Sequence, residues 1–237
     1  MEREQLIVKV CGMRDAANIE SVAKLGVDMI GLIFCRTSPR YVSMVDSLAG
    51  FMPNYTVNQL KEMKNPSKST DIKVAPKRVG VFIDEMPQTI ITHVYNYRLD
   101  YVQLHGYENR IMIENLRRTI EPDIRRNVKF IKTLHVSTLE DVEEYKDYEG
   151  AVDMFLFDTS CRLGGGSGQK FNWDLLKQYS GETPFLLSGG IGPEDVDNIK
   201  NFNHPRFIGV DLNSRFEIKP ALKNIDLLQE FIQSLRK

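Results

Sequence analysis

The sequence has little of what marks a secreted, membrane-bound or nucleic-acid-binding protein. It contains no run of about 18 apolar residues, the length that a membrane-spanning helix needs, and residues 1–5 are rich in charge, so we expect neither a membrane span nor a signal peptide. Lysine and arginine number 31 against 32 aspartates and glutamates, and this net charge of −1 supplies no basic surface for a phosphate backbone. We therefore expect a cytoplasmic protein with no nucleic-acid or membrane partner.

Cysteine and histidine are also scarce. The three cysteines lie far apart without C-x-x-C spacing, which argues against a disulfide framework and a structural zinc site. The four histidines are scattered along the chain and give no support for a metal site. Neither G-x-G-x-x-G nor G-x-x-x-x-G-K-[ST] occurs, which disfavours dinucleotide and nucleoside triphosphate chemistry. The residues concerned are Cys11, Cys35, Cys161, His93, His105, His135 and His204.

The length and composition are those of one folded domain. The chain has 237 residues, of which 42% are hydrophobic and 27% charged, so it can bury a core. That length is close to the roughly 250 residues typical of a (β/α)₈ barrel. A single domain over residues 1–237 is therefore favoured over two smaller ones.

Eight short apolar runs alternate with stretches of helical periodicity. The runs are mostly continuous rather than alternating, which is typical of parallel strands buried on both faces. Eight strands interleaved with helices favour a closed (β/α)₈ TIM barrel of the α/β class over an open sheet. The expected strands are Leu6–Val10, Met29–Phe34, Arg78–Ile83, Tyr101–Leu104, Val128–Ile131, Met154–Phe157, Pro184–Leu187 and Phe207–Val210, and the expected helices are Ala16–Leu25, Pro87–Tyr97, Arg110–Thr119, Thr138–Tyr145, Trp173–Tyr179, Pro193–Phe202 and Asn224–Leu235.

Local signals mark where helices begin and where the alternation is interrupted. Capping residues or a proline at the first helical position predict helix starts at Asp15, Ser137, Asn172 and Gly192–Asp195. Residues 52–77 contain three prolines and a polar cluster with only a weak helical signal. We interpret this stretch as an insertion before the third strand, too poor in apolar residues to form a second domain.

Glycine-rich and polar residues follow three neighbouring strands, those numbered six to eight. Backbone N–H groups in such loops can converge on an anion, and this rim of a barrel is a common phosphate site. One glycine cluster alone can equally serve a tight turn, but three on adjacent strands favour a phosphate-binding cup. Its expected residues are Gly165, Gly166, Gly168, Gly189, Gly190, Asp211, Asn213 and Ser214.

Three further side chains follow strands at the same rim. Cys11 is either inert core filling or a base acting as a thiolate. Asp158 ends an apolar strand and is either an ion-pair partner or an acid with a raised pKa. Arg40 suits a bidentate contact with a planar carboxylate, although a surface ion pair is the alternative. Cys11 and Asp158 are thus candidate catalytic residues, and Arg40 is a candidate for substrate binding.

An ordered set of motifs resembles the phosphoribosylanthranilate isomerase family. The match covers nearly the whole chain except residues 52–77, and although each motif is common, the ordered set is specific. The motifs are Lys9-Val10-Cys11-Gly12-Met13, Ser38-Pro39-Arg40-Tyr41-Val42, Arg78-Val79-Gly80-Val81-Phe82, Val102-Gln103-Leu104-His105-Gly106, Phe157-Asp158-Thr159, Gly165-Gly166-Ser167-Gly168 with Phe171-Asn172-Trp173, and Leu187-Ser188-Gly189-Gly190-Ile191.

The resemblance implies an enzyme of tryptophan biosynthesis that needs no metal or organic cofactor. Its reaction would be the Amadori rearrangement of N-(5-phosphoribosyl)anthranilate to 1-(2-carboxyphenylamino)-1-deoxyribulose 5-phosphate. Asp158 would be the general acid at the ring oxygen, Cys11 the base at C2′, and Arg40 the ligand of the anthranilate carboxylate. The expected partner is this phosphorylated sugar substrate, in a monomer or a homodimer.

The sequence departs from the family after the last strand, and two other classes compete with the isomerase. Asn213 stands where the family often has serine, Arg215 where it has glycine, and Ala221 where a glycine commonly follows proline. Phosphate contacts there are less certain than in the preceding loops. A flavin-dependent barrel would use the same cup for FMN but give the set of Cys11, Arg40 and Asp158 no role. A non-catalytic binding barrel would keep the cup but would not need both proton-transfer groups.

Overall fold

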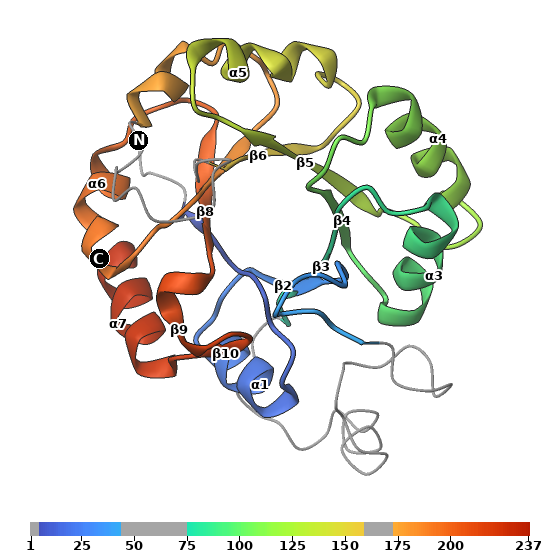
Figure 1. The fold of residues 1–237 in the computed structure, drawn as a ribbon. Helices are drawn as coiled ribbons and strands as arrows, with labels where there is room; N and C mark the ends of the chain where they lie inside the picture. The colour runs from blue at the N-terminus through green and yellow to red at the C-terminus, as the bar shows by residue number, and fades with distance from the viewer. Residues whose placement is uncertain (1–4, 44–74, 159–172) are drawn as a thin grey trace.

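The computed structural model describes residues 5–43, 75–158 and 173–237, and these form a closed barrel of eight parallel strands inside a ring of helices (Figure 1). Each strand pairs with its neighbours in sequence order, and β1 closes the ring on β8 with Ile7 opposite Gly209. The strands are β1 Ile7–Val10, β2 Met29–Ile33, β3 Lys77–Phe82, β4 Tyr101–Leu104, β5 Lys129–His135, β6 Met154–Asp158, β7 Phe185–Ser188 and β8 Phe207–Leu212.

The helices lie outside the strands, as the sequence predicts (Figure 1). Asp15 caps α1 by accepting a hydrogen bond from the Asn18 amide, and Pro87 opens α3 at its first helical position. The α-helices are α1 Ala16–Lys24, α3 Pro87–Tyr97, α4 Arg110–Ile120, α5 Leu139–Glu143, α6 Val196–Asn201 and α7 Ile225–Arg236; the 3₁₀ turns are η2 Glu144–Asp147, η3 Trp173–Gln178, η4 Pro193–Asp195 and η5 Ser214–Phe216, and a hairpin joins β9 Glu217–Lys219 to β10 Leu222–Lys223.

Two buried layers explain why the strand sequences are continuously apolar. One layer packs the outer faces of the strands against the helices. The other fills the barrel interior and includes Met29, Val79, Ile131 and Leu186 from four different strands, together with Cys11 directly after β1. Because both faces of each strand are buried, apolar residues occupy successive positions instead of alternating with polar ones.

The structure corrects details of the sequence prediction outside the barrel strands and at the start of β3. The N-cap of α5 is Thr138 and not Ser137, because the Asp141 carboxylate accepts from the Thr138 amide while the Thr138 hydroxyl accepts from the Asp141 amide. The stretch from Trp173 is a 3₁₀ turn and not an α-helix. Lys77, the expected end of the insertion, is already the first residue of β3, whereas residues 52–74 and the predicted cap Asn172 lie outside the described residues. None of the described helices is long and apolar enough to cross a membrane.

Candidate active site

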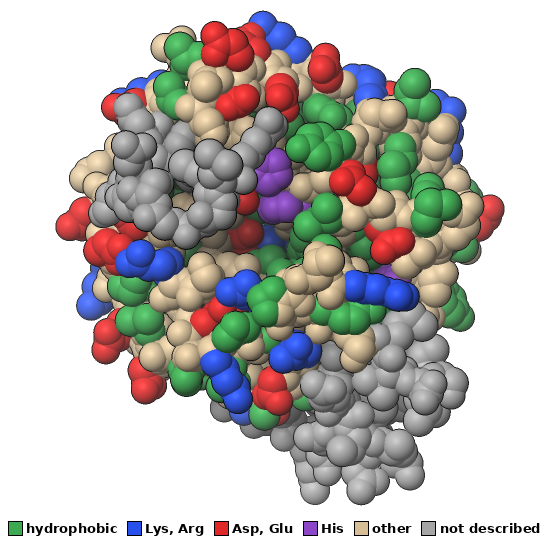
Figure 2. Space-filling model, in the orientation of Figure 1, with side chains coloured by type: hydrophobic (Ala, Val, Ile, Leu, Met, Phe, Trp, Pro, Cys, Tyr) green, Lys and Arg blue, Asp and Glu red, His purple; other side chains and the backbone are tan. Residues whose placement is uncertain are grey.

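The candidate residues gather at one end of the barrel, where the strands end and the loops to the helices begin. Cys11 follows β1 directly, Asp158 is the last residue of β6, and Arg40 lies in the loop after β2. Figure 2 shows that this face is hollowed near its centre, where histidine side chains lie beside acidic and basic ones. The loops thus bring titratable groups from distant parts of the sequence to one depression.

Cys11 is buried in the barrel interior. Its Sγ takes the space beside Gly31, where an added Cβ would lie 2.7 Å from the sulfur. Burial raises the pKa of the Cys11 thiol, and the nearby ammonium groups of Lys9 and Lys223 act in the opposite direction. The thiolate form therefore depends on these two cations.

Lys9 is held inside the barrel by Asp211. Its Nζ lies 2.8 Å from Asp211 Oδ1, and both side chains are buried. Burial by itself would lower the pKa of Lys9, but the Asp211 carboxylate and Cys11 outweigh it and raise the pKa, so the ammonium stays charged. Asp211, an expected residue of the phosphate cup, thus faces Lys9 across the β1–β8 seam.

Asp158 lies beside two histidines. Its Oδ2 is 3.6 Å from His105 Nε2 and 4.0 Å from His135 Nδ1. His135 Nε2 lies 3.2 Å from the His105 carbonyl oxygen, and because a carbonyl only accepts, Nε2 carries the hydrogen. The other ring nitrogen of His135, Nδ1, is the one that faces Asp158.

The second histidine beside Asp158, His105, has a neutral ring. Burial lowers the pKa of His105 to about 4, so its ring is neutral near pH 7. The ring contacts that of His135 at a centroid distance of 5.0 Å. A neutral ring 3.6 Å from the Asp158 carboxyl group can exchange a hydrogen bond with it.

One group of side chains in the described part of the chain has the spacing of metal ligands. It consists of His105, His135 and Asp158. One ligand atom of each lies within 4.8 Å of the others. The sequence analysis did not bring these residues together, because 30 residues separate the histidines. In the structure His105 directly follows β4, and His135 ends β5 opposite Asp158 on β6. The position of each histidine after an apolar strand was the signal that could have found this group.

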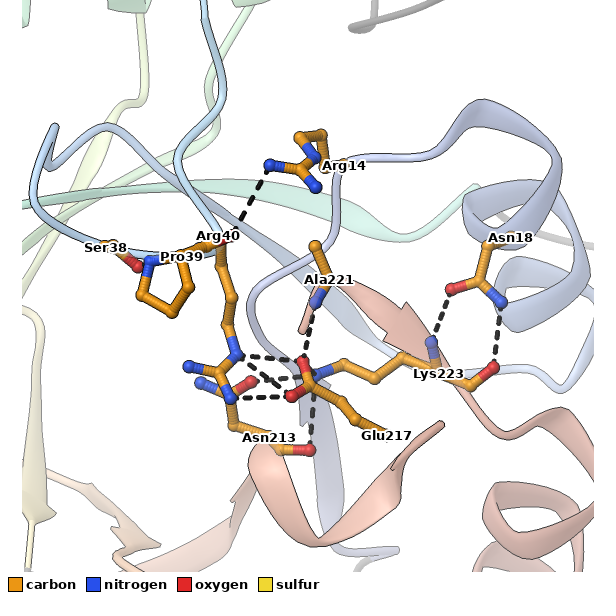
Figure 3. Close-up of polar contacts among 9 residues, drawn as sticks. All are labelled: Arg14, Asn18, Ser38, Pro39, Arg40, Asn213, Glu217, Ala221 and Lys223. Atoms are coloured by element: carbon orange, nitrogen blue, oxygen red, sulfur yellow. Dashed lines mark hydrogen bonds and ion pairs between the residues drawn. The ribbon is translucent and has the colours of Figure 1, made fainter. Parts of the chain in front are cut away.

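Arg40 forms a bidentate ion pair with Glu217 at the start of β9 (Figure 3). Its Nε lies 2.9 and 3.1 Å from the two carboxylate oxygens, and its Nη2 lies 2.6 Å from Oε2. The stem of Arg40 crosses over Gly12, where an added Cβ would lie 2.5 Å from Arg40 Cδ and where φ is +74°. Gly12 thereby brings the guanidinium next to Cys11.

The residues expected in the phosphate cup differ in their surroundings, as far as the structure describes them. Gly189 and Gly190 both have left-handed backbone angles, and a Cβ on Gly190 would meet nothing within 4 Å, so the backbone there borders open space. Ser214 is exposed at the start of η5. The Asn213 side chain accepts a hydrogen bond from Lys223 Nζ at 2.8 Å. Gly165, Gly166 and Gly168 lie outside the described residues.

A closed parallel barrel with a thiol, a carboxyl group and several cations at its strand ends defines a TIM-barrel enzyme that acts on a small anionic molecule. Residues 8–234 match the family model described as N-(5'phosphoribosyl)anthranilate (PRA) isomerase. The chain belongs to this family.

Individual relatives agree with the family match. The chain is 43% identical to the N-(5'-phosphoribosyl)anthranilate isomerase of Parabacteroides distasonis, over 97% of this chain and 93% of that one. It is similar to the crystal structure of phosphoribosyl anthranilate isomerase from Thermotoga maritima, with a TM-score of 0.73, 28% identity and 98% coverage of both chains. A structure of monomers generated from the dimeric enzyme of the same organism has a TM-score of 0.69, 26% identity and the same coverage.

Proposed function

We propose that Cys11 and Asp158 supply the base and the acid with which this chain, an isomerase of N-(5-phosphoribosyl)anthranilate in tryptophan biosynthesis, rearranges its substrate. The observation that carries the proposal is their placement at the same rim, Cys11 after β1 and Asp158 at the end of β6, with cations beside the thiol and neutral His105 beside the carboxyl group. An Amadori rearrangement needs one group that gives a proton to the sugar ring and one that removes a proton from carbon.

The first step opens the ribose ring. Asp158 gives its proton to the ring oxygen, the bond from C1′ to that oxygen breaks, and the nitrogen lone pair forms a C1′=N double bond. The positive charge on this iminium makes the C2′ proton acidic. Asp158 is left as a carboxylate beside His105.

The second step moves the double bond. The Cys11 thiolate takes the C2′ proton, the electron pair of that bond forms C1′=C2′, and the iminium nitrogen regains its lone pair. The resulting enolamine takes a proton at C1′ and loses the hydroxyl proton at C2′, which gives the ketose. Lys9 and Lys223 stabilise the thiolate before the transfer.

The two ends of the substrate are anions, and the proposal gives each a partner. Arg40 would hold the aromatic carboxylate, and the backbone at Gly189 and Gly190, together with Gly165, Gly166, Gly168 and Ser214, would hold the 5′-phosphate. Binding of these remote groups fixes the sugar between acid and base. The reaction itself then needs no metal or organic cofactor.

The activity is tested by the fluorescence of freshly prepared N-(5-phosphoribosyl)anthranilate. We expect the signal to fall when the purified, colourless protein is added without metal or flavin, and the product to have the mass of the substrate. Unchanged fluorescence would instead support a barrel that only binds. A yellow protein whose activity follows added flavin would support a flavin enzyme.

The proposed setting is the cytoplasm, with the protein as a monomer or a homodimer. The Thermotoga maritima relative is described as a dimeric enzyme, which supports a homodimer. No helix among the described residues could cross a membrane, which is compatible with the cytoplasm. Light scattering of the purified chain distinguishes the two oligomeric states.

A further inference from the structure

Three charged side chains at the rim carry an unbalanced charge. Glu217 accepts from Arg40 and also from Lys223 Nζ at 2.8 Å, so one carboxylate serves two cations (Figure 3). The exposed fractions of the side chains are 18% for Arg40, 5% for Glu217 and 0% for Lys223. Taken as ions, these three groups, which we call the rim triad, sum to +1.

The hydrogen bonds support the charged form of each member. Lys223 Nζ has three acceptors, Glu217 Oε1, Asn213 Oδ1 and the Asn213 carbonyl, which matches the three donors of an ammonium group. Although burial opposes it, hydrogen bonds from Arg40 and Lys223 lower the pKa of Glu217. Burial lowers the pKa of Lys223, while its hydrogen bond to Glu217 acts in the opposite direction. With its three acceptors we take Lys223 as an ammonium group, and the rim triad then attracts an anion.

Glu217 uses only one edge of the guanidinium. Its two oxygens take the edge formed by Nε and Nη2 of Arg40. Within the described residues, no acceptor is hydrogen-bonded to Nη1, so the edge formed by Nη1 and Nη2 remains for a second planar carboxylate.

The carboxylate of Glu217 is itself fixed. The Ala221 amide donates to its Oε1 at 3.2 Å, and the backbone of Lys223 is tied to α1 by two hydrogen bonds with the Asn18 side chain, of 2.8 and 3.0 Å. The orientation of Arg40 is therefore set by a hairpin that is anchored to the barrel and not by a mobile surface partner (Figure 3).

We propose that Glu217 is a positioning residue for substrate recognition, which with Lys223 fixes the plane of Arg40 so that its free edge meets the aromatic carboxylate of the substrate. The inference rests on the proposed role of Arg40. The incoming carboxylate neutralises the excess charge of the rim triad, which makes the site selective for a substrate with a carboxylate on its ring. A purely structural Glu217 would have no such selectivity.

The test uses two substrates that differ only in that carboxylate, N-(5-phosphoribosyl)anthranilate and N-(5-phosphoribosyl)aniline. For Glu217→Gln we expect kcat/KM to fall about tenfold or more with the first substrate, mainly through KM, and to change less than about twofold with the second. Equal losses with both substrates would make Glu217 structural, and no loss with either would also overturn the inference.

A conservative variant and a control variant complete the test. Glu217→Asp retains the charge on a shorter stem and should show a smaller loss, again only with the anthranilate substrate; it replaces Glu217→Gln if that variant does not fold. Glu194→Gln is the matched control, because Glu194 forms an exposed ion pair with Arg215 outside the rim triad. This control should leave both rates unchanged.

Arg40→Ala separates this inference from the function it rests on. We expect it to lower kcat/KM about ten- to a hundredfold with the anthranilate substrate alone. If Arg40→Ala affects both substrates equally, the proposed role of Arg40 fails. If Arg40→Ala is selective and Glu217→Gln is not, only the role of Glu217 fails.

Discussion

At the scale of single residues, the charge around Cys11 determines when the thiol can act as a base. Burial raises its pKa, Lys9 lowers it, and the Asp211 carboxylate raises it again. Lys9 and Asp211 are partners in one ion pair, so removing them has opposite consequences for the thiolate.

These opposite effects predict two shifts of the pH profile. Asp211→Asn should move the rising acidic limb of kcat/KM to lower pH, because the thiolate loses a repelling charge. Adding Lys9→Met to that variant should move the limb back to higher pH, because the stabilising cation is then lost. The measurement is kcat/KM from pH 6 to 11 for the three proteins, because the raised pKa of the Cys11 thiol places the limb at alkaline pH. Limbs that coincide would mean that Cys11 is not the titrating base.

At the scale of elements, a substitution in the turn after β7 tests whether Gly190 belongs to the phosphate cup. Gly190 and Gly150 share a left-handed φ, +67° and +81°, and open space around an added Cβ, but only Gly190 lies in the expected cup. Gly190→Val and Gly150→Val should therefore cost similar stability, because both strain the backbone.

Substrate binding should separate the two glycine variants. Gly190→Val should raise KM about tenfold or more, at least about 1.4 kcal/mol of lost binding, because a branched side chain obstructs the phosphate. Gly150→Val should leave KM unchanged. Steady-state titrations, with the melting temperatures compared, decide the matter. Equal KM values in both variants would remove Gly190 from the phosphate site.

The possible metal ligands at the ends of β4, β5 and β6 lead us to expect inhibition by zinc. His105, His135 and Asp158 offer two nitrogens and one oxygen, a set that Zn²⁺ accepts, and the metal would occupy the carboxyl group that must donate a proton. Micromolar ZnCl₂ should slow turnover reversibly, and a chelator should restore it.

The histidine variants show whether this set is responsible. His135→Asn should weaken the inhibition, while His204→Asn, whose ring contacts Tyr179 away from the rim, should not. The readout is the zinc concentration that halves the rate, relative to each variant without zinc. Equal inhibition of the two variants would place the metal elsewhere, for example on Cys11.

At the scale of the whole molecule, the barrel could be predicted from the sequence, whereas several contacts between side chains could not. Continuous apolar runs and helical spacing located all eight strands, because a closed parallel sheet buries both faces of each strand. The ends of β5 and β8 were placed too early: β5 runs on to His135 and β8 to Leu212, since polar residues there face the barrel interior or the rim.

Side-chain partners depend on closure of the ring and so leave no local signal. Lys9 meets Asp211 only because β1 pairs with β8, 202 residues away. Glu217 meets Arg40 only because the β9–β10 hairpin approaches the loop after β2. Ala221 has φ +66°, which explains why a glycine is common at its position in the family. The assignment of Cys11, Asp158 and Arg40 to one rim needed only the strand order.

The central claim is that Cys11 and Asp158 together perform the rearrangement, and one set of measurements tests it most directly. The rate of fluorescence loss from N-(5-phosphoribosyl)anthranilate is compared among the unmodified chain, Cys11→Ala and Asp158→Ala, with binding of a product analogue measured in parallel. We expect each variant to lose at least about 10² in kcat/KM while still binding the analogue, because proton transfer is lost and the anion contacts remain. Near-normal turnover in either variant would contradict the claim for that residue.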